Sequence, residues 1–150
     1  MIKHQAKWLL VGLMCLPLWP GLTHGQSAVV RDAYNRSLEL RAEGRYQEAI
    51  PFAETAVRFG QEEFGPDHPN TATLLNDLAE LYRVQGLYAE AEPLHQRSLA
   101  IFEKALGLDH PYMVKTLTNL AKLCEELGKG EEAAILSAQA KAMQERLVGR

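Results

Sequence analysis

Two aspartate–histidine pairs, each followed by proline, are the residues in this sequence most suited to chemistry. Asp67-His68-Pro69 recurs 42 residues later as Asp109-His110-Pro111. Imidazole and carboxylate groups are common metal ligands, so the recurrence admits a metal site shared between neighbouring copies. A histidine cap before a proline at the first helical position explains the same triplets without a metal. We therefore predict two helix starts, with no metal and no cofactor.

The other reactive side chains are interpreted as structural. His95 falls at a packing position between predicted helices, and Cys124 aligns with Leu40 and Tyr82 at the same spacing of 42. We expect both to be buried, and an intermolecular disulfide through Cys124 is the alternative. Residues 128–130 contain two glycines and a lysine, but no strand precedes them, which favours a turn over a phosphate-binding loop. Without a recognisable catalytic motif, the protein is predicted not to be an enzyme.

The period of 42 residues organises most of the chain. Glycine recurs at Gly44, Gly86 and Gly128, and a Glu-Ala pair begins four residues after each of them. In each copy a first helix can end at the glycine, which accepts a left-handed cap, and a second helix then follows. One helix pair cannot bury its apolar face alone, so three pairs are expected to stack. The predicted repeats span approximately residues 30–60, 69–106 and 111–148.

Residues 1–25 differ in composition from the repeats. Two lysines precede a 12-residue apolar run at 8–19, which is shorter than the roughly 20 residues of a membrane span. A basic start, a short apolar stretch and small residues up to Gly25 are typical of a secretory signal peptide. We predict cleavage after Gly25, export to the periplasm or the exterior, and a mature domain of residues 26–150. The alternative is an uncleaved membrane anchor, and a lipoprotein cut before Cys15 is disfavoured because Met14 stands where a small residue is needed.

Charge and composition limit the partners. The chain is 47% hydrophobic and 23% charged, an ordinary globular composition, with a formal net charge of −3. Removal of residues 1–25 would leave 14 basic and 19 acidic residues, a net charge of −5. This balance argues against nonspecific binding to nucleic acid, so no nucleic-acid partner is expected.

The repeated motifs resemble those of a known family. Gly-x-Tyr-x-Glu-Ala at 44–49 and 86–91, and Leu-Gly-x-Asp-His-Pro at 106–111, are similar to tetratricopeptide repeats. They resemble the 42-residue kind found in kinesin light chains. The third copy departs from the pattern, with Gly130 in place of the tyrosine and Ile135 in place of a proline. The resemblance covers nearly the whole mature chain and implies an all-α fold, a right-handed α-solenoid of three helix-turn-helix repeats.

The resemblance also implies a function and a site. The first helices of such repeats line a concave groove that binds a peptide, which predicts a non-enzymatic, exported scaffold or adaptor. Asn76 matches an asparagine that hydrogen-bonds the peptide backbone in the family. With Glu125, the predicted groove carries a charge of +3, which favours an acidic peptide, although an ordinary solvated helix face is the alternative. The predicted peptide-binding residues are Arg31, Tyr34, Leu38, Arg41, Thr73, Asn76, Glu80, Arg83, Lys115, Thr118 and Lys122.

A second function is predicted from the last helix. Helical spacing places Ala133, Leu136, Ala140, Met143 and Leu147 on an inward face. Three alanines then form a small-residue stripe on another face, namely Ala134, Ala138 and Ala142. A self-associating structural subunit that uses this uncapped helix is therefore the alternative to a peptide-binding module. Alanine is also simply a good helix former, which accounts for the stripe without any docking.

Overall fold

The computed structural model describes the backbone of residues 22–149 and the side chains from residue 28 onward. The predicted signal peptide lies outside the described residues, except that residues 22–25 belong to the first helix. The described part contains no helix with the length and hydropathy needed to cross a membrane.

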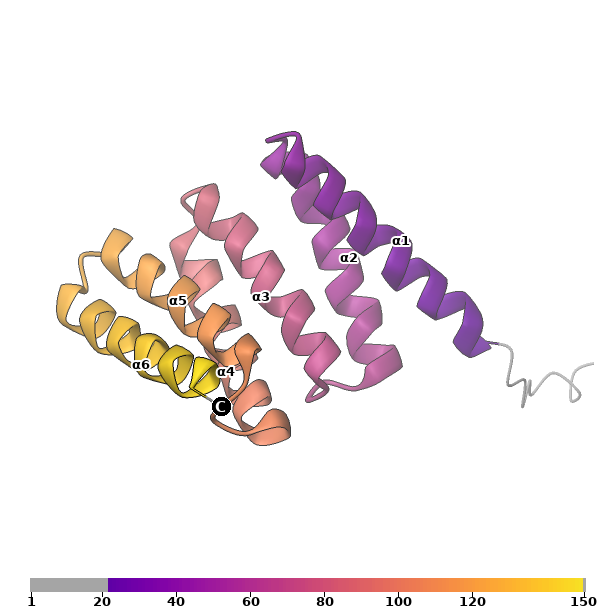
Figure 1. Ribbon diagram of the computed structural model, residues 1–150. Helices are drawn as coiled ribbons and strands as arrows, with labels where there is room; N and C mark the ends of the chain where they lie inside the picture. The colour runs from indigo at the N-terminus through magenta and orange to yellow at the C-terminus, as the bar shows by residue number, and fades with distance from the viewer. Residues whose placement is uncertain (1–21, 150) are drawn as a thin grey trace, which may run out of the picture.

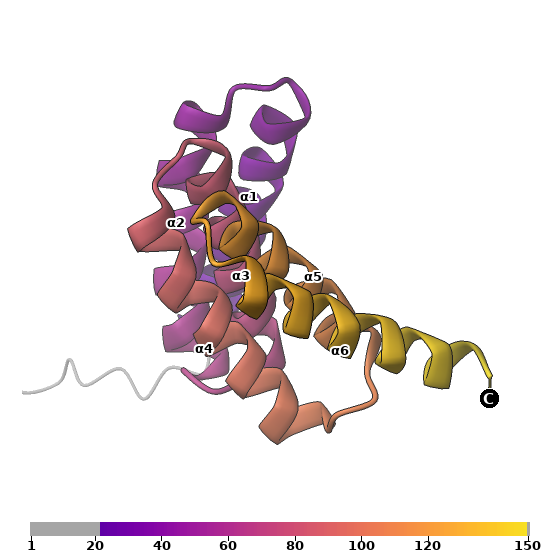
Figure 2. The same cartoon turned by 90° about the vertical axis from the view of Figure 1, so that its left-hand side faces the viewer.

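Six helices make up almost all of residues 22–149 and form three antiparallel pairs (Figures 1 and 2). Each pair packs internally, and successive pairs pack through α2 against α3 and through α4 against α5. The all-α class and the stacked helix-turn-helix repeats are thus confirmed. The helices are α1 (Leu22–Ala42), α2 (Tyr46–Phe64), α3 (Pro69–Val84), α4 (Tyr88–Leu106), α5 (Pro111–Glu126) and α6 (Gly130–Val148).

The Asp-His-Pro triplets start helices α3 and α5, as predicted. The Nδ1 atom of His68 accepts a hydrogen bond from the Asn70 backbone N–H at 3.1 Å. His110 caps α5 in the same way, accepting from the Tyr112 N–H at 3.3 Å. Both histidines therefore satisfy N–H groups that have no partner inside their own helix. Among the described residues, no cluster of three or more histidine, cysteine or acidic side chains could hold a metal ion.

Glycines end the first helix of each pair. Gly44, Gly86 and Gly128 have φ values of 74°, 77° and 74°, the left-handed conformation that glycine adopts without steric penalty. The first repeat extends beyond the predicted 30–60 at both ends. Its α1 begins at Leu22, and its α2 continues through Gly60 to Phe64.

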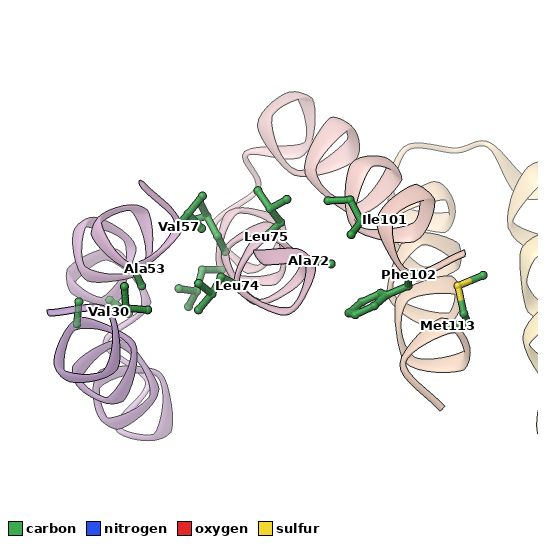
Figure 3. Close-up of a cluster of buried hydrophobic side chains, with 14 of the residues drawn as sticks. Val30, Ala53, Val57, Ala72, Leu74, Leu75, Ile101, Phe102 and Met113 are labelled. Carbon is green, nitrogen blue, oxygen red and sulfur yellow. The ribbon is translucent and has the colours of Figure 1, made fainter. Parts of the chain in front are cut away.

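The core runs through the array as a band between successive pairs, with large apolar side chains from neighbouring repeats in contact (Figure 3). Phe102 of α4 is 1% exposed and its ring stacks on Tyr112 of α5, with centroids 5.2 Å apart. Helices α2 and α3 approach closely at Gly60, where an added Cβ would lie 2.5 Å from Leu74 Cδ1. His95 and Cys124 are both buried, as predicted.

The last helix presents polar side chains at its outer end face. Three residues of α4 that are buried or half-buried are His95, Leu99 and Phe102. The residues 42 positions later in α6 are exposed and polar, namely Ser137, Lys141 and Gln144. Helix α6 therefore lacks the apolar ring with which Phe102 of α4 stacks on Tyr112 of the following repeat, and it lacks a counterpart of His95, which contacts Asn76 within its own repeat.

The first helix shows the same substitution at the opposite end of the array. Helix α3 contributes three buried leucines to its contacts, Leu74, Leu78 and Leu81. The residues 42 positions earlier in α1 are exposed and charged, namely Asp32, Arg36 and Glu39. Arg36 and Glu39 form an ion pair at 3.0 Å. At both ends of the described array, polar side chains thus occupy positions that hold apolar side chains in the middle repeat.

The alanine stripe of α6 lies on the outer surface. Ala134, Ala138 and Ala142 are exposed, while Ala133, Ala140 and Met143 are buried and Leu136 and Leu147 half-buried, so the predicted orientation of α6 is confirmed. The equivalents of Ala138 and Ala142 in α4 are Gln96 and Ala100, which are also exposed. The stripe therefore belongs largely to a surface that the middle repeat also leaves open to solvent.

Candidate peptide-binding face

The first helices of the three pairs are α1, α3 and α5, and the surface that they present together is called here the first-helix face. Several polar contacts join these helices across the repeats, and three of them link residues 43 positions apart. The Tyr34 hydroxyl donates to Asp77 Oδ2 at 2.6 Å, and Asn119 Nδ2 donates to Asn76 Oδ1 at 3.4 Å. Arg83 donates to Glu126. The two residues of each of these contacts are 43 positions apart in the sequence, which is one more than the repeat period of 42.

The predicted peptide-binding residues differ in how far they reach solvent. The exposed ones are Arg31, Leu38, Lys115, Thr118 and Lys122. The partly buried ones are Tyr34, Arg41, Thr73 and Arg83, whereas Asn76 and Glu80 are buried. The side chains of Arg31 and Lys115 are 68% and 50% exposed, but each also has an acidic partner within the chain. Arg31 pairs with the exposed Asp32 at 3.3 Å, and Lys115 pairs with Asp77 at 3.1 Å.

A hollow of about 300 Å³ opens beside the start of α3. Its lining is largely apolar and includes three of the predicted residues, Arg31, Tyr34 and Thr73. Aromatic side chains from three helices also contribute to it. The lining residues are Val30, Arg31, Tyr34, Phe64, Asn70, Thr73, Leu74 and Tyr112.

Asn76 is tied into the interior of the second repeat. Its side chain is 2% exposed, and His95 Nδ1 lies 3.0 Å from Asn76 Oδ1. We assign the proton to Nδ1, because Oδ1 can only accept. Burial lowers the pKa of His95 to about 4, so the ring is neutral at pH 7. Hydrogen bonding of Asn76 to a peptide backbone stays a prediction, and it would require this side chain to reach the surface.

Arg83 is a structural cation. It forms ion pairs with Glu80 and with Glu126, and its side chain is only 15% exposed. Burial raises the pKa of Glu80, but the hydrogen bond and charge of Arg83 outweigh burial and hold that pKa below its ordinary value. Removal of Arg83 would leave a buried carboxylate without its partner, which is strongly destabilising.

Asp77 is the principal residue that the sequence analysis missed. Its carboxylate lies among Tyr34, Arg41 and Lys115, all three of which were predicted as site residues. The signal that could have found it is the spacing of 43, which pairs Tyr34 with Asp77 and Arg83 with Glu126. When Asp77 and Glu126 are counted with the predicted residues, the net charge of the predicted groove falls from +3 to +1.

Known proteins share this architecture. A crystal structure of BtubC (BKLC) from P. vanneervenii superposes with a TM-score of 0.76 at 20% identity, covering 81% of this chain and 48% of that one. Nearly identical TPR-like repeats of the kinesin light chain type, from Podosopora anserina, give a TM-score of 0.70 at 27% identity, covering 77% and 55%. The chain thus spans about half the length of these structures. No curated protein matches it.

Stacked helix pairs with a ligand-accessible face define a solenoid of the protein-interaction class. The tetratricopeptide repeat family matches residues 30–86 and 71–146 of the chain. The chain therefore belongs to the tetratricopeptide repeat family, with repeats like those of kinesin light chains. Repeats of this family generally mediate protein–protein interaction and are not enzymatic.

Proposed function

We propose that the protein is an adaptor that binds an acidic peptide segment along the first-helix face. The observation that carries the proposal is the placement of exposed cations beside an apolar hollow. Arg31 and Tyr34 line the hollow, and Lys115 and Lys122 stand exposed on the third repeat. An apolar anchor in the hollow and carboxylates at the cations would together bind an extended or helical segment, with exposed pairs adding about 0–1 kcal/mol each.

We also propose that the adaptor acts after export. The composition of residues 1–25 supports this part of the proposal: a basic start, an apolar run and small residues. Mass spectrometry of the natively expressed protein would find an N-terminus near residue 26. An intact Met1 on a cytoplasmic protein would contradict export.

Self-association through α6 is the competing function. The polar residues Ser137, Lys141 and Gln144 disfavour a head-to-tail contact at the end face. The alanine stripe of Ala134, Ala138 and Ala142 remains as an exposed small-residue surface. The mass in solution at micromolar concentration separates the two functions, because the adaptor is monomeric without its partner.

Replacement of both Arg31 and Lys122 by alanine is expected to weaken acidic-peptide binding by about three- to thirtyfold. The two side chains are exposed, and each exposed ion pair contributes about 0–1 kcal/mol. Calorimetric titration at about 0.1 M salt measures this loss of affinity. At about 1 M salt the natural chain should also bind the peptide more weakly, because the screening length falls to about 3 Å.

The matched control replaces Lys104 and Lys141, two exposed lysines outside the first-helix face. It removes the same charge and should leave binding unchanged. Equal losses in both double variants would mean that net charge alone matters. Unchanged binding after loss of Arg31 and Lys122 would contradict the proposed site.

A further inference from the structure

Asp77 joins the first helices of all three repeats. It lies on α3, accepts from Tyr34 of α1 at 2.6 Å through Oδ2, and accepts from Lys115 of α5 at 3.1 Å through Oδ1. The Arg41 Nη1 atom of α1 is 4.0 Å from the same Oδ1. The Asp77 side chain is 10% exposed, whereas those of Arg41 and Lys115 are 38% and 50% exposed. The carboxylate is therefore fixed beneath two cations that still face solvent.

We propose that Asp77 determines specificity, as an internal carboxylate that competes with ligand carboxylates for Lys115 and Arg41. This inference rests on the proposed peptide-binding function and specifies its ligand. A ligand carboxylate that reached either cation would come close to the negative charge of Asp77, in a partly buried place where water screens poorly. Carboxylates of the ligand are accordingly favoured away from Asp77, near Arg31 and Lys122.

The partner fitted by this arrangement is a segment with an uncharged middle and acidic residues toward its ends. Neutral hydrogen-bonding groups can meet Lys115 and Arg41 without repulsion from Asp77. Arg31 lies on α1 and Lys122 on α5, so they stand on the two outer helices of the first-helix face, on either side of α3. A uniformly acidic peptide binds less well than the number of cations on this face suggests.

The substitution Asp77→Asn isolates the charge from the shape of the side chain. The amide oxygen at the position of Oδ1 can still accept from Lys115, and the amide NH2 at the position of Oδ2 can donate to the Tyr34 hydroxyl oxygen, so both contacts that join the helices have a partner. Labelled decaglutamate is the probe, and decaglutamine is its uncharged counterpart. We expect Asp77→Asn to bind decaglutamate three- to thirtyfold more tightly than the natural chain, the range for one or two released ion pairs.

Asp67→Asn is the matched control. Asp67 is an exposed carboxylate that pairs with Lys104 at 3.6 Å in the connection before α3. The control makes the same chemical change and adds the same charge, so it tests whether any neutralised aspartate strengthens binding. Its affinity for decaglutamate should equal that of the natural chain, and circular dichroism should show the same helicity in both variants.

Lys115→Gln supplies a second test that does not depend on how well the Asp77 variant folds. Because Asp77 already neutralises Lys115, the substitution should weaken decaglutamate binding less than twofold in the natural chain. In the Asp77→Asn background, Lys115→Gln should lower the affinity for decaglutamate at least fivefold. The difference between the two backgrounds is the non-additivity expected of two residues in contact.

Two results would overturn the inference. One is decaglutamate binding by Asp77→Asn that is no tighter than that of the natural chain, or absent. The other is an equal loss of decaglutamate affinity when Lys115→Gln is made in the natural chain and in the Asp77→Asn variant. Failure of the proposed function is a separate result, because it is read from the Arg31 and Lys122 variants. If those variants weaken binding while Asp77→Asn changes nothing, only the role of Asp77 is lost.

Discussion

Replacing Phe102 with alanine is expected to destabilise the protein by about 3–5 kcal/mol, the range for a fully buried aromatic side chain. The ring is 1% exposed and stacks on Tyr112, so its removal opens a cavity between the second and third repeats. Stability in repeat arrays is approximately a sum of repeat and interface contributions. The loss should therefore uncouple α5 and α6 from the rest of the array.

Urea denaturation followed by circular dichroism measures the size of this loss, and amide hydrogen exchange locates it. Exchange should accelerate more in α5 and α6 than in α1 and α2. Phe52→Ala is the matched control, because Phe52 is 39% exposed and its loss should cost less than about 1 kcal/mol. Uniform acceleration across all six described helices would show that the array unfolds as a single unit.

Acidification is expected to destabilise the natural chain by about 2–3 kcal/mol between pH 7 and about pH 4.5, through His95. The pKa of His95 is lowered to about 4 by burial in the folded protein, against about 6.5 in the unfolded chain. The unfolded state therefore takes up the proton first as the pH falls. The stability that depends on neutral His95 is complete above pH 6.5 and is lost on the way down to about pH 4.

The groups that surround His95 leave this direction unchanged. The negative charges of Glu80 and Asp77 raise the pKa of His95, whereas Arg83 lowers it, and burial outweighs them all. The pKa of Glu80 is itself held low by Arg83, so its contribution is lost only below its ordinary pKa of 4.5. The window between pH 6.5 and 4.5 thus reports on His95 rather than on Glu80.

His95→Gln separates this effect from general acid unfolding. Glutamine can donate to Asn76 Oδ1 but does not titrate in this range. Urea denaturation of both chains at pH 7 and about pH 4.5 measures their free energies of unfolding. Between these two pH values the variant should lose about 2 kcal/mol less of its free energy of unfolding than the natural chain. Equal losses would place the acid sensitivity elsewhere in the molecule.

Local rules explain why the helix boundaries could be predicted from the sequence. A histidine cap with proline behind it, or a glycine with positive φ, acts within one turn, so Pro69, Pro111 and Gly86 could be interpreted from their neighbours alone. The end of α2 at Phe64 lies four residues beyond the approximate boundary predicted at residue 60, and Gly60 is an interior residue of the helix. Its role is the close approach of α2 to Leu74, which depends on the neighbouring repeat.

The site was predicted less completely, because the repeat period gives the register of the helices and not the contacts between them. Tyr34 meets Asp77 and Arg83 meets Glu126 at a spacing of 43, which reflects the stagger of packed helices. Asn76 was placed in the groove by resemblance alone. Its buried side chain contacts His95 and Asn119, and the residues that correspond to His95 in the other repeats are the smaller Ala53 and Ser137.

Photocrosslinking in the native host tests the central proposal, peptide binding on the first-helix face, most directly. A benzophenone side chain would replace Thr118, which is exposed on α5, and in a separate strain Ala138, which is exposed on the alanine stripe of α6. The proposal predicts a covalent adduct with a different protein from position 118 and none from position 138. Adducts from position 138 alone, or products with twice the mass of the chain, would contradict it and favour self-association.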